Sequence, residues 1–330
     1  MKAPGFWYGE RVSALGAVLS PLGLVYGCAT ALRQRLGRTE NAGVPAVCVG
    51  NLTAGGAGKT PVVIDIARRL AATGRRPHVI SRGYGGTAGA RAPRRVDLAA
   101  DTAAQVGDEP LMIARTTPVW VGADRAAAAR AAVAGGADVL VLDDGFQDPS
   151  LAKDVSIVVA DGRHGFGNGF MVPAGPLRET LRAGLARANA LVIIGDDAWG
   201  VADAAARFGP EGLPVLTARV VPGPEIARIS EILGVAFAGI GHPEKFFRTL
   251  RDNGCRLAGT QAFPDHHPYS EGDLDALRRR AEALKARLVT TEKDLARIPA
   301  ERRAGIEVLT ITLQWDDEAA LDRLLQPVNP

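Results

Sequence analysis

Short apolar runs alternate along the chain with longer stretches whose apolar residues recur every three or four positions. The runs predict strands at residues 46–50, 77–81, 138–144, 155–161 and 190–195. The longer stretches predict helices between them, such as residues 61–74 and the alanine-rich residues 123–136, which both close with glycine. This alternation is typical of a parallel α/β sheet with helices on both faces.

A second, smaller α/β unit is expected after residue 234. Residues 214–230 contain several prolines and predict extended segments and a linker. Beyond them the pattern predicts strands at 234–241, 287–294 and 306–315, and helices at 243–254 and from Asp273. We therefore expect four segments: 1–40 as an N-terminal helical part of the first domain, 41–213 as the main domain, 214–234 as an extended linker, and 235–330 as a smaller domain.

The N-terminal segment has a different pattern, because residues 12–32 contain no charged side chain. On a helical wheel one face is apolar and the other carries mainly small residues. The apolar face consists of Leu15, Val18, Leu19, Leu22, Val25, Tyr26, Ala29 and Leu32. Spanning a membrane takes about 20 strongly apolar residues, and Pro21 with several glycines weakens this segment. The pattern favours an amphipathic helix lying in a membrane interface, while a helix packed on its own domain stays an equal alternative.

Composition narrows the class of protein only slightly. The chain has 330 residues, of which 47% are hydrophobic and 23% charged, which indicates a globular protein large enough for two cores. A formal net charge of +3 suits phosphate-bearing substrates, an anionic membrane or nucleic acid, and does not choose among them. Cys28, Cys48 and Cys255 are too far apart for a zinc site or a disulfide framework, which favours reduced thiols in the cytoplasm.

The stretch "VGNLTAGGAGKTP", residues 49–61, has the context of a phosphate-binding loop, since a predicted strand precedes it and a predicted helix follows. The usual pattern begins with glycine where this chain has Thr53. The expected nucleotide-binding residues are Thr53, Ala54, Gly55, Gly56, Ala57, Gly58, Lys59 and Thr60. Backbone N–H groups would face phosphate oxygens, Lys59 would reach the β- and γ-phosphates, and Thr60 would hold Mg²⁺. The alternative is a glycine-rich turn with a chance lysine.

Acidic residues follow two further elements. "DVLVLDDG" ends a predicted buried strand with Asp143 and Asp144, and Gln147 comes just beyond them. A nucleotide-binding domain needs such a group to organise Mg²⁺, so we interpret one of this pair as a metal-organising residue. In "GDEPLMIAR", Asp108 and Glu109 precede a predicted helix. Asp108 is equally suited to capping that helix, and the residues alone do not make it catalytic.

Together, "VGNLTAGGAGKTP", "SRGYGG", "GDEP", "DDGFQ", "PAGPLRE", "FPDHHPYS" and "VTTEKD" resemble the tetraacyldisaccharide 4'-kinase family of lipid A biosynthesis. The likeness runs from the aromatic N-terminal segment to about Asp294, and the order and spacing of so many motifs make it specific. It implies a nucleotide-binding domain of the P-loop type, with the smaller domain contributing to the active-site cleft. It also implies transfer of the γ-phosphate of ATP to the 4'-hydroxyl of a tetraacyl disaccharide 1-phosphate, giving lipid IV-A.

The resemblance also assigns roles to single residues. Asp108 matches a catalytic aspartate that accepts the hydroxyl proton, and His266 of "FPDHH" matches a histidine that supports it; with Lys59 they are the expected catalytic residues. The residues expected around the metal and phosphates are Thr60, Glu109, Asp143, Asp144 and Gln147. The residues expected near the substrate or phosphates are Tyr84, Arg125, Arg178 and Glu179. Many family members have a basic residue after "RGYG", where this chain has Gly86, so a phosphate contact from that position is not expected.

The resemblance further implies ATP and Mg²⁺ as cofactors and an acylated disaccharide 1-phosphate lipid as substrate. The expected location is the cytoplasmic face of the inner membrane, with the inner-membrane surface as a partner, no nucleic acid, and a monomeric protein.

Three other functions are alternatives to a lipid kinase. A membrane-recruited P-loop ATPase acting as a conformational switch is the main alternative, but such proteins carry an extra lysine at the start of the loop, where Thr53 stands here. A GTPase normally recognises guanine with N-K-x-D, whereas Lys293 and Asp294 are adjacent. A nucleotide-gated binding module would leave Asp108 and His266 without a task.

Overall fold

The computed structural model describes residues 4–9, 13–89 and 92–329. The strands are β1 (Ala46–Gly50), β2 (Pro77–Ser81), β3 (Arg94–Arg95), β4 (Val119–Val121), β5 (Val139–Asp143), β6 (Val155–Asp161), β7 (Ala190–Ile194), β8 (Val215–Pro222), β9 (Leu233–Ala238), β10 (Arg256–Ala262), β11 (Arg287–Thr291), β12 (Ile306–Leu309) and β13 (Ile311–Trp315). The helices are α1 (Ala14–Leu36), α2 (Lys59–Ala72), α3 (Ala103–Val106), α4 (Asp108–Ala114), α5 (Arg125–Ala134), α6 (Leu181–Leu185), α7 (Val201–Phe208), α8 (Glu225–Ser230), α9 (Pro243–Asp252), α10 (Glu271–Ala283), α11 (Glu292–Arg297) and α12 (Glu318–Leu325). Three short 3₁₀ helices are η1 (Gly5–Tyr8), η2 (Ala300–Arg302) and η3 (Gln326–Val328).

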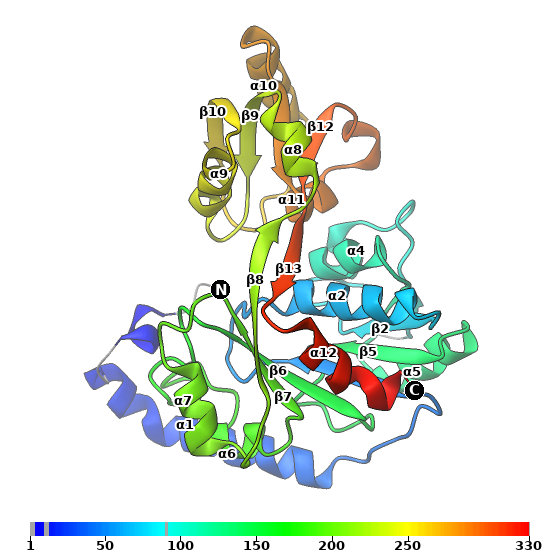
Figure 1. Ribbon diagram of the computed structural model, residues 1–330, viewed down its shortest axis with the longest axis vertical. Helices are drawn as coiled ribbons and strands as arrows, with labels where there is room; N and C mark the ends of the chain where they lie inside the picture. Colours follow the sequence, from blue (N-terminus) through cyan, green and yellow to red (C-terminus); the bar gives the residue numbers. More distant parts are fainter. Residues whose placement is uncertain (1–3, 10–12, 90–91, 330) are drawn as a thin grey trace.

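The larger of two units is built on a mostly parallel sheet. In the described residues its nine strands have the order β13-β8-β7-β6-β1-β5-β2-β4-β3, and β1 lies between its parallel neighbours β5 and β6. Helices α2, α4 and α12 contribute to the apolar core on one face of the sheet, and α5, α6 and α7 to the core on the other (Figure 1). The predicted α/β class with helices on both faces is confirmed.

The predicted division of the chain differs from the structure in two places. Residues 215–222, expected in a linker, form β8 and pair with β7 inside the large sheet. The predicted strand 306–315 is two strands: β12 pairs with β11 in the second unit, and β13 pairs antiparallel with β8 in the first. The larger unit therefore takes residues 4–222 and 311–329, and the smaller one residues 223–310. An apolar run shows that a segment is buried, but not in which sheet.

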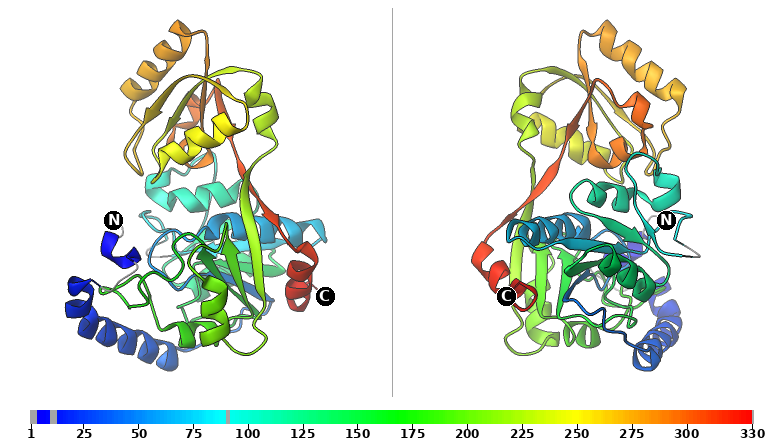
Figure 2. Two further views of the ribbon diagram at one scale, coloured as in Figure 1. Left: turned by 60° about the vertical axis from the view of Figure 1, so that its left-hand side comes forward. Right: turned by 90° about the vertical axis from the view of Figure 1, so that its right-hand side faces the viewer.

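The smaller unit has its own parallel sheet, of order β10-β9-β11-β12 in the described residues. Apolar side chains of α8 and α9 pack on one face, and those of α10 on the other. The strands β8 and β13 run between the two units (Figures 1 and 2). Helix α11 of the smaller unit lies against α4 of the larger one, which brings residues far apart in the sequence into contact.

Helix α1 packs on the larger unit through its small residues. Gly16 and Gly23 are its buried residues, and a Cβ atom at Gly23 would lie 2.9 Å from the carbonyl oxygen of Met171. The predicted apolar face points away from the domain: Val18 is 75% exposed and Val25 67%. By length and composition α1 is apolar enough to cross a membrane. Of the predicted segment 12–32, residue 12 lies outside the described residues.

Candidate active site

The predicted phosphate-binding loop, residues 53–60, lies at the carboxyl end of the central strand β1. Gly55 and Gly58 have φ values of 129° and 79°, which side-chain-bearing residues rarely adopt, and α2 begins immediately after Gly58. Asn51 Nδ2 donates hydrogen bonds of 2.8 Å to the carbonyl oxygen of Thr53 and 3.3 Å to that of Gly55. The loop therefore keeps its curve without a glycine at position 53. The free N–H groups at the start of α2 make this a favourable place for phosphate.

Two adjacent carboxylates at the end of β5 have opposite electrostatic surroundings. Asp143 is buried and accepts a 3.0 Å hydrogen bond from Ser81 Oγ. Burial, together with the negative charges of Glu109 and Asp144, raises the pKa of Asp143 to about 6. Asp144 also loses solvation by burial, but the cations of Lys59 and Arg178 outweigh that effect and hold its pKa below the ordinary value.

The distances from Asp144 to its cationic neighbours are short enough for direct pairing. Lys59 Nζ lies 3.5 Å from Asp144 Oδ1, and Arg178 Nη1 lies 2.9 Å from the same oxygen. Asp144 has a φ of 52°, uncommon for a residue with a side chain. The loop lysine and the acidic pair therefore belong to one cluster.

The oxygen donors at this edge fit a magnesium ion. Mg²⁺ prefers oxygen ligands and usually combines one or two carboxylates with phosphate oxygens and water. The Thr60 hydroxyl and the Asp143 carboxylate are donors of this kind, and the charge of Glu109 acts on Asp143. Within the described ranges, no group of three or more Asp, Glu, His or Cys side chains could hold a metal by itself. A hydroxyl and a carboxylate oxygen suit an ion whose other ligands are phosphate oxygens and water.

Asp108 meets a histidine and an arginine of the smaller unit. Its Oδ2 lies 2.9 Å from His266 Nδ1, 2.9 Å from Arg297 Nε and 2.5 Å from Arg297 Nη2. The N-cap of α4 is Gly107, and the hydrogen bonds found for the Asp108 carboxylate go to His266 and Arg297 of the other unit. The capping interpretation of Asp108 is therefore wrong.

The surroundings of Asp108 keep it ionised. Burial alone would raise its pKa, but the hydrogen bond and charge of Arg297 and the hydrogen bond of His266 lower the pKa below its ordinary value. His266 has a φ of 60°. Such backbone conformations persist only where surrounding contacts hold them, and they are frequent at functional sites.

Three predicted residues form a buried layer beneath the acidic pair. Gln147 donates to the carbonyl oxygen of Asn51 at 2.8 Å and to Glu179 at 3.0 Å, and accepts from Arg178 at 3.3 Å. Arg125 Nη2 donates to the carbonyl oxygen of Asp144 at 2.8 Å. Arg125, Gln147 and Glu179 are all less than 10% exposed.

This layer continues to the N-terminal helix. Arg187 lies 2.8 Å from Glu179 Oε2 and donates a 2.8 Å hydrogen bond to Gln34 of α1. Arg33 of α1 donates to the carbonyl oxygen of Gln147 at 3.1 Å. The last turn of α1 is therefore tied to the residues that support the acidic pair.

Tyr84 lies in the glycine-rich loop after β2, beside the turn that carries Asp108. A Cβ atom at Gly107 would lie 2.7 Å from the carbonyl oxygen of Tyr84, so the two backbones touch. The Tyr84 side chain is 87% exposed. Gly86 is packed as closely, because a Cβ there would lie 2.4 Å from the carbonyl oxygen of Gln105. The close approach explains why glycine suits position 86 in this chain.

Sequence reasoning missed four residues of the cluster: Asn51, Ser81, Asp294 and Arg297. Of these, only Asp294 and Arg297 form a recognisable sequence pattern. They are an acidic and a basic residue three positions apart, which places them on one face of a helix. Their target, Asp108, is 189 positions from Arg297, and nothing local marks that pairing.

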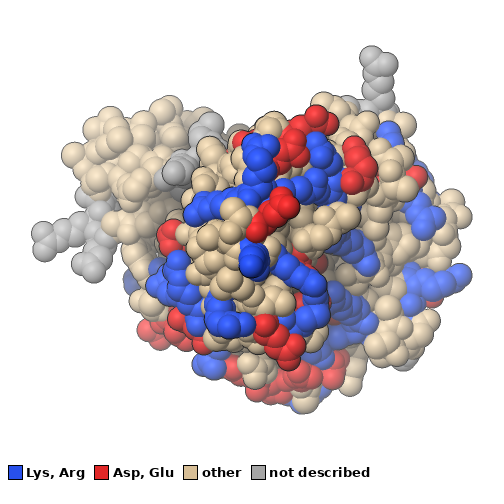
Figure 3. Space-filling view, turned by 90° about the horizontal axis from the view of Figure 1, so that it is seen from above, with Lys and Arg blue, Asp and Glu red and all other residues tan. Residues whose placement is uncertain are grey.

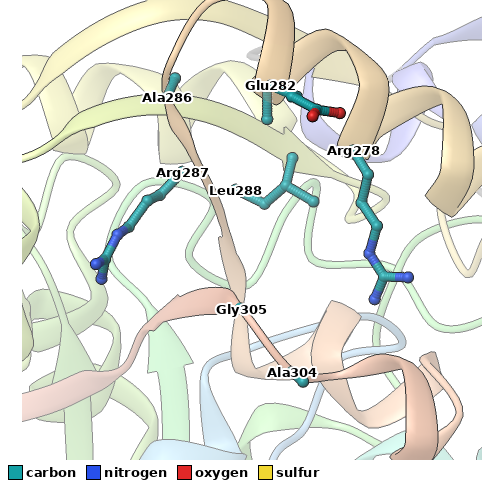
Figure 4. A pocket seen from close by; sticks show the side chains of 8 residues that line it. Arg278, Glu282, Ala286, Arg287, Leu288, Ala304 and Gly305 are labelled. Atoms are coloured by element: carbon teal, nitrogen blue, oxygen red, sulfur yellow. The ribbon is translucent and has the colours of Figure 1, made fainter.

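A surface hollow at the outer end of the smaller unit is separate from this cluster. It is lined by Arg278, Ala281, Glu282, Ala286, Arg287, Leu288, Ala304 and Gly305 (Figure 4). The guanidinium groups of Arg278 and Arg287 lie on opposite sides, the first bound to the carbonyl oxygen of Arg302 and the second to Glu307. Basic and acidic side chains are interspersed over the surface seen from above (Figure 3). Both arginines at this hollow therefore already have protein partners.

Comparisons with known proteins agree on one family. The model of the family described as LpxK, tetraacyldisaccharide-1-P 4'-kinase, matches residues 15–329. The tetraacyldisaccharide 4'-kinase of Rhodospirillum centenum is 51% identical over 332 residues, covering 99% of this chain and 97% of that protein. The protein of the same name from Paramagnetospirillum magneticum is 50% identical over 331 residues, covering 100% and 99%.

A solved structure shares the fold. The crystal structure of LpxK from Aquifex aeolicus in complex with ATP matches with a TM-score of 0.75 and 24% identity, covering 96% of this chain and all of that one. Because the family model matches residues 15–329 of its 330 residues, this chain belongs to the tetraacyldisaccharide-1-P 4'-kinase family.

Proposed function

We propose that this protein transfers the γ-phosphate of ATP to the 4'-hydroxyl of tetraacyl disaccharide 1-phosphate, giving lipid IV-A. The observation that carries the proposal is the ionised Asp108 at the junction of the two units, in contact with His266 and Arg297. Glu109, the following residue, is close enough to Asp143 to raise its pKa, so the two clusters form one site. The names of the relatives support the substrate and the reaction.

In the proposed reaction Asp108 accepts the proton of the 4'-hydroxyl. The oxygen–phosphorus bond to the γ-phosphate forms, the bond between that phosphorus and the bridging oxygen of ADP breaks, and the proton passes to Oδ1 of Asp108. Oδ2 is already bound to Arg297 and His266. Phosphoryl transfer depends mainly on positioning and charge neutralisation, which the loop N–H groups and Lys59 would supply.

Mg²⁺ would be held by Thr60 and the acidic edge, with Asp143 as its most suitable carboxylate and Glu109 beside it. When bound, the ion would supply charge neutralisation for the transferring phosphate. Asp144 would instead hold Lys59 and Arg178 in place, because it is paired with both.

The buried residues of the cluster would support the site from behind. Arg125, Gln147 and Glu179 each hydrogen-bond to protein groups, so we assign them to positioning the acidic pair. Arg178, which is less buried, would reach phosphate once nucleotide binds. Tyr84 is exposed on the loop that packs on Gly107 and would contact the lipid or nucleotide.

We further propose that α1 lies in the cytoplasmic face of the inner membrane as a peripheral or monotopic anchor of a monomeric enzyme. Its outward apolar side supports this, because an exposed row of leucine and valine is costly in water. Leu22→Glu with Val25→Glu should reduce binding to anionic phospholipid vesicles. The matched control is Leu284→Glu, which adds charge at an exposed leucine of the smaller unit. Equal binding by all variants would argue against α1 as the anchor.

The reaction is tested with purified protein, MgATP and the tetraacyl disaccharide 1-phosphate. We expect a doubly phosphorylated lipid, and ATP consumption that depends on the lipid. The Asp108→Ala variant should lose turnover while ATP affinity changes little. ATP hydrolysis at one rate with and without lipid, and no lipid product, would refute the kinase proposal and favour the conformational switch.

A further inference from the structure

Arg297 is the most extensively bonded cation in the cluster. It extends from the last turn of α11 and its side chain is only 4% exposed. Two of its nitrogens contact Oδ2 of Asp108, and Nη1 donates to the carbonyl oxygen of Gly239 at 2.7 Å. A guanidinium is planar and always charged, so these contacts fix both its position and its plane.

The motif "VTTEKD" explains how Arg297 is held. Asp294 is completely buried and lies 3.3 Å from Arg297 Nη1. Its carboxylate also accepts hydrogen bonds from the Gly239 N–H at 2.9 Å, the Tyr269 hydroxyl at 2.9 Å and the Thr291 hydroxyl at 2.7 Å. Arg297 is therefore anchored on the smaller unit before it reaches across to Asp108.

The two carboxylate oxygens of Asp108 have different surroundings. Oδ2 meets two nitrogens of Arg297 and one of His266, whereas no hydrogen bond to Oδ1 is found among the described residues. A carboxylate held through one oxygen leaves the other to meet a hydroxyl proton. The direction of that second oxygen then depends on where Arg297 stands.

We propose that Arg297 is a positioning residue for phosphoryl transfer: it orients the carboxylate of Asp108 and makes that orientation depend on contact between α11 and α4. The proposal rests on the proposed function, in which Asp108 accepts the proton. The proposal also gives the motif "VTTEKD" a function, because its Asp294 holds Arg297 in place. Because Asp108 belongs to the larger unit and Arg297 to the smaller, the base is correctly oriented only when the units are in contact.

A purely structural clamp would behave differently from a positioning residue. Loss of a clamp would lower stability and loosen the contact of the units, so kcat would fall only together with stability. Loss of a positioning residue would lower kcat even where thermal stability and KM for ATP are unchanged, because the free oxygen of Asp108 would no longer be directed at the hydroxyl. The split between kcat, KM and stability therefore separates the two roles.

The experiment compares Arg297→Ala, Arg297→Lys and Arg302→Ala in the full-length enzyme, with Asp108→Ala as reference. Arg302 is an arginine of the same unit that pairs with Asp275 instead. For Arg297→Ala we expect kcat about 10- to 100-fold lower, the range for loss of a hydrogen bond to a charged group. KM for ATP should change little.

Arg297→Lys keeps the charge but not the two-nitrogen contact. Its kcat should stay reduced while its thermal stability and its KM for ATP match those of the parent enzyme. Arg302→Ala should match the parent enzyme. If Arg297→Ala is recovered unfolded, the test uses Arg297→Lys alone. That variant should have a reduced kcat at unchanged thermal stability.

Two results would overturn the inference. One is a kcat of Arg297→Lys equal to that of the parent enzyme at unchanged thermal stability, and the other is a loss that lies wholly in KM for ATP. Asp108→Ala separates this inference from the proposed function. If Asp108→Ala is inactive while Arg297→Ala is unimpaired, only the role of Arg297 fails; if Asp108→Ala keeps full turnover, the proposed base itself is wrong.

Discussion

Replacing Asp143 by asparagine should stabilise the ligand-free protein at alkaline pH and impair catalysis. Burial and the charges of Glu109 and Asp144 raise the pKa of Asp143 from 3.8 to about 6. The unfolded chain loses this proton near the ordinary pKa, so the folded form binds more protons between these values and stability falls as pH rises. At about 1.4 kcal/mol per unit, an ionised Asp143 costs the folded protein about 3 kcal/mol above pH 7.

The assay is urea denaturation in EDTA, followed by tryptophan fluorescence at pH 8 and pH 5. The Asp143→Asn variant should gain about 3 kcal/mol of unfolding free energy at pH 8. At pH 5 it should gain about half of that, because most of the folded parent protein still keeps the proton of Asp143. The control Glu211→Gln removes an exposed carboxylate and should change neither value. A variant that is equally or less stable than its parent at pH 8 would refute the reasoning. In a transfer assay with MgATP the same variant should be strongly impaired, because a carboxylate suited to Mg²⁺ is gone.

Three further predictions concern the loop and the N-terminal helix. Lys59→Ala should lower kcat by about 10² to 10³, since it removes a charge aimed at the transferring phosphate; a change confined to KM would contradict this. Asn51→Ala removes both hydrogen bonds that shape the loop and should raise KM for ATP about tenfold, measured by steady-state kinetics. Gly23→Ile should cost about 1–3 kcal/mol of stability by forcing α1 away from Met171, whereas Ala29→Ile on the exposed side should be neutral in the same thermal unfolding assay.

The large sheet could be predicted from the sequence because its strands are buried on both faces. Strands so placed read as continuous apolar runs, and the predicted 46–50, 77–81 and 155–161 are the observed β1, β2 and β6. The carboxyl ends of such strands form one edge, where ligands of open α/β sheets bind. That rule alone brings the phosphate-binding loop and Asp143 together.

The smaller unit was harder to predict, because its boundary is not marked in the sequence. Thr310 separates β12 from β13 inside a run that looks like one strand, and the two halves serve different sheets. The C-terminal helix α12 likewise returns to the larger unit, where Leu321, Leu325 and Val328 are buried. A pattern of period two predicts that a strand exists and which side is buried, but its partner strand depends on the path of the whole chain.

The environment of Asp108 shows where sequence reasoning ends. The residue type and its place before a helix are compatible with a cap or with a base, and only the family resemblance favoured the base. The structure separates the two, because the side chain turns away from α4 toward His266 and Arg297. Those partners come from a loop and a helix of the other unit, and each is held by contacts of its own. An acid group acquires its chemistry from such distant partners, so its role is decided by the assembled fold and not by the local motif.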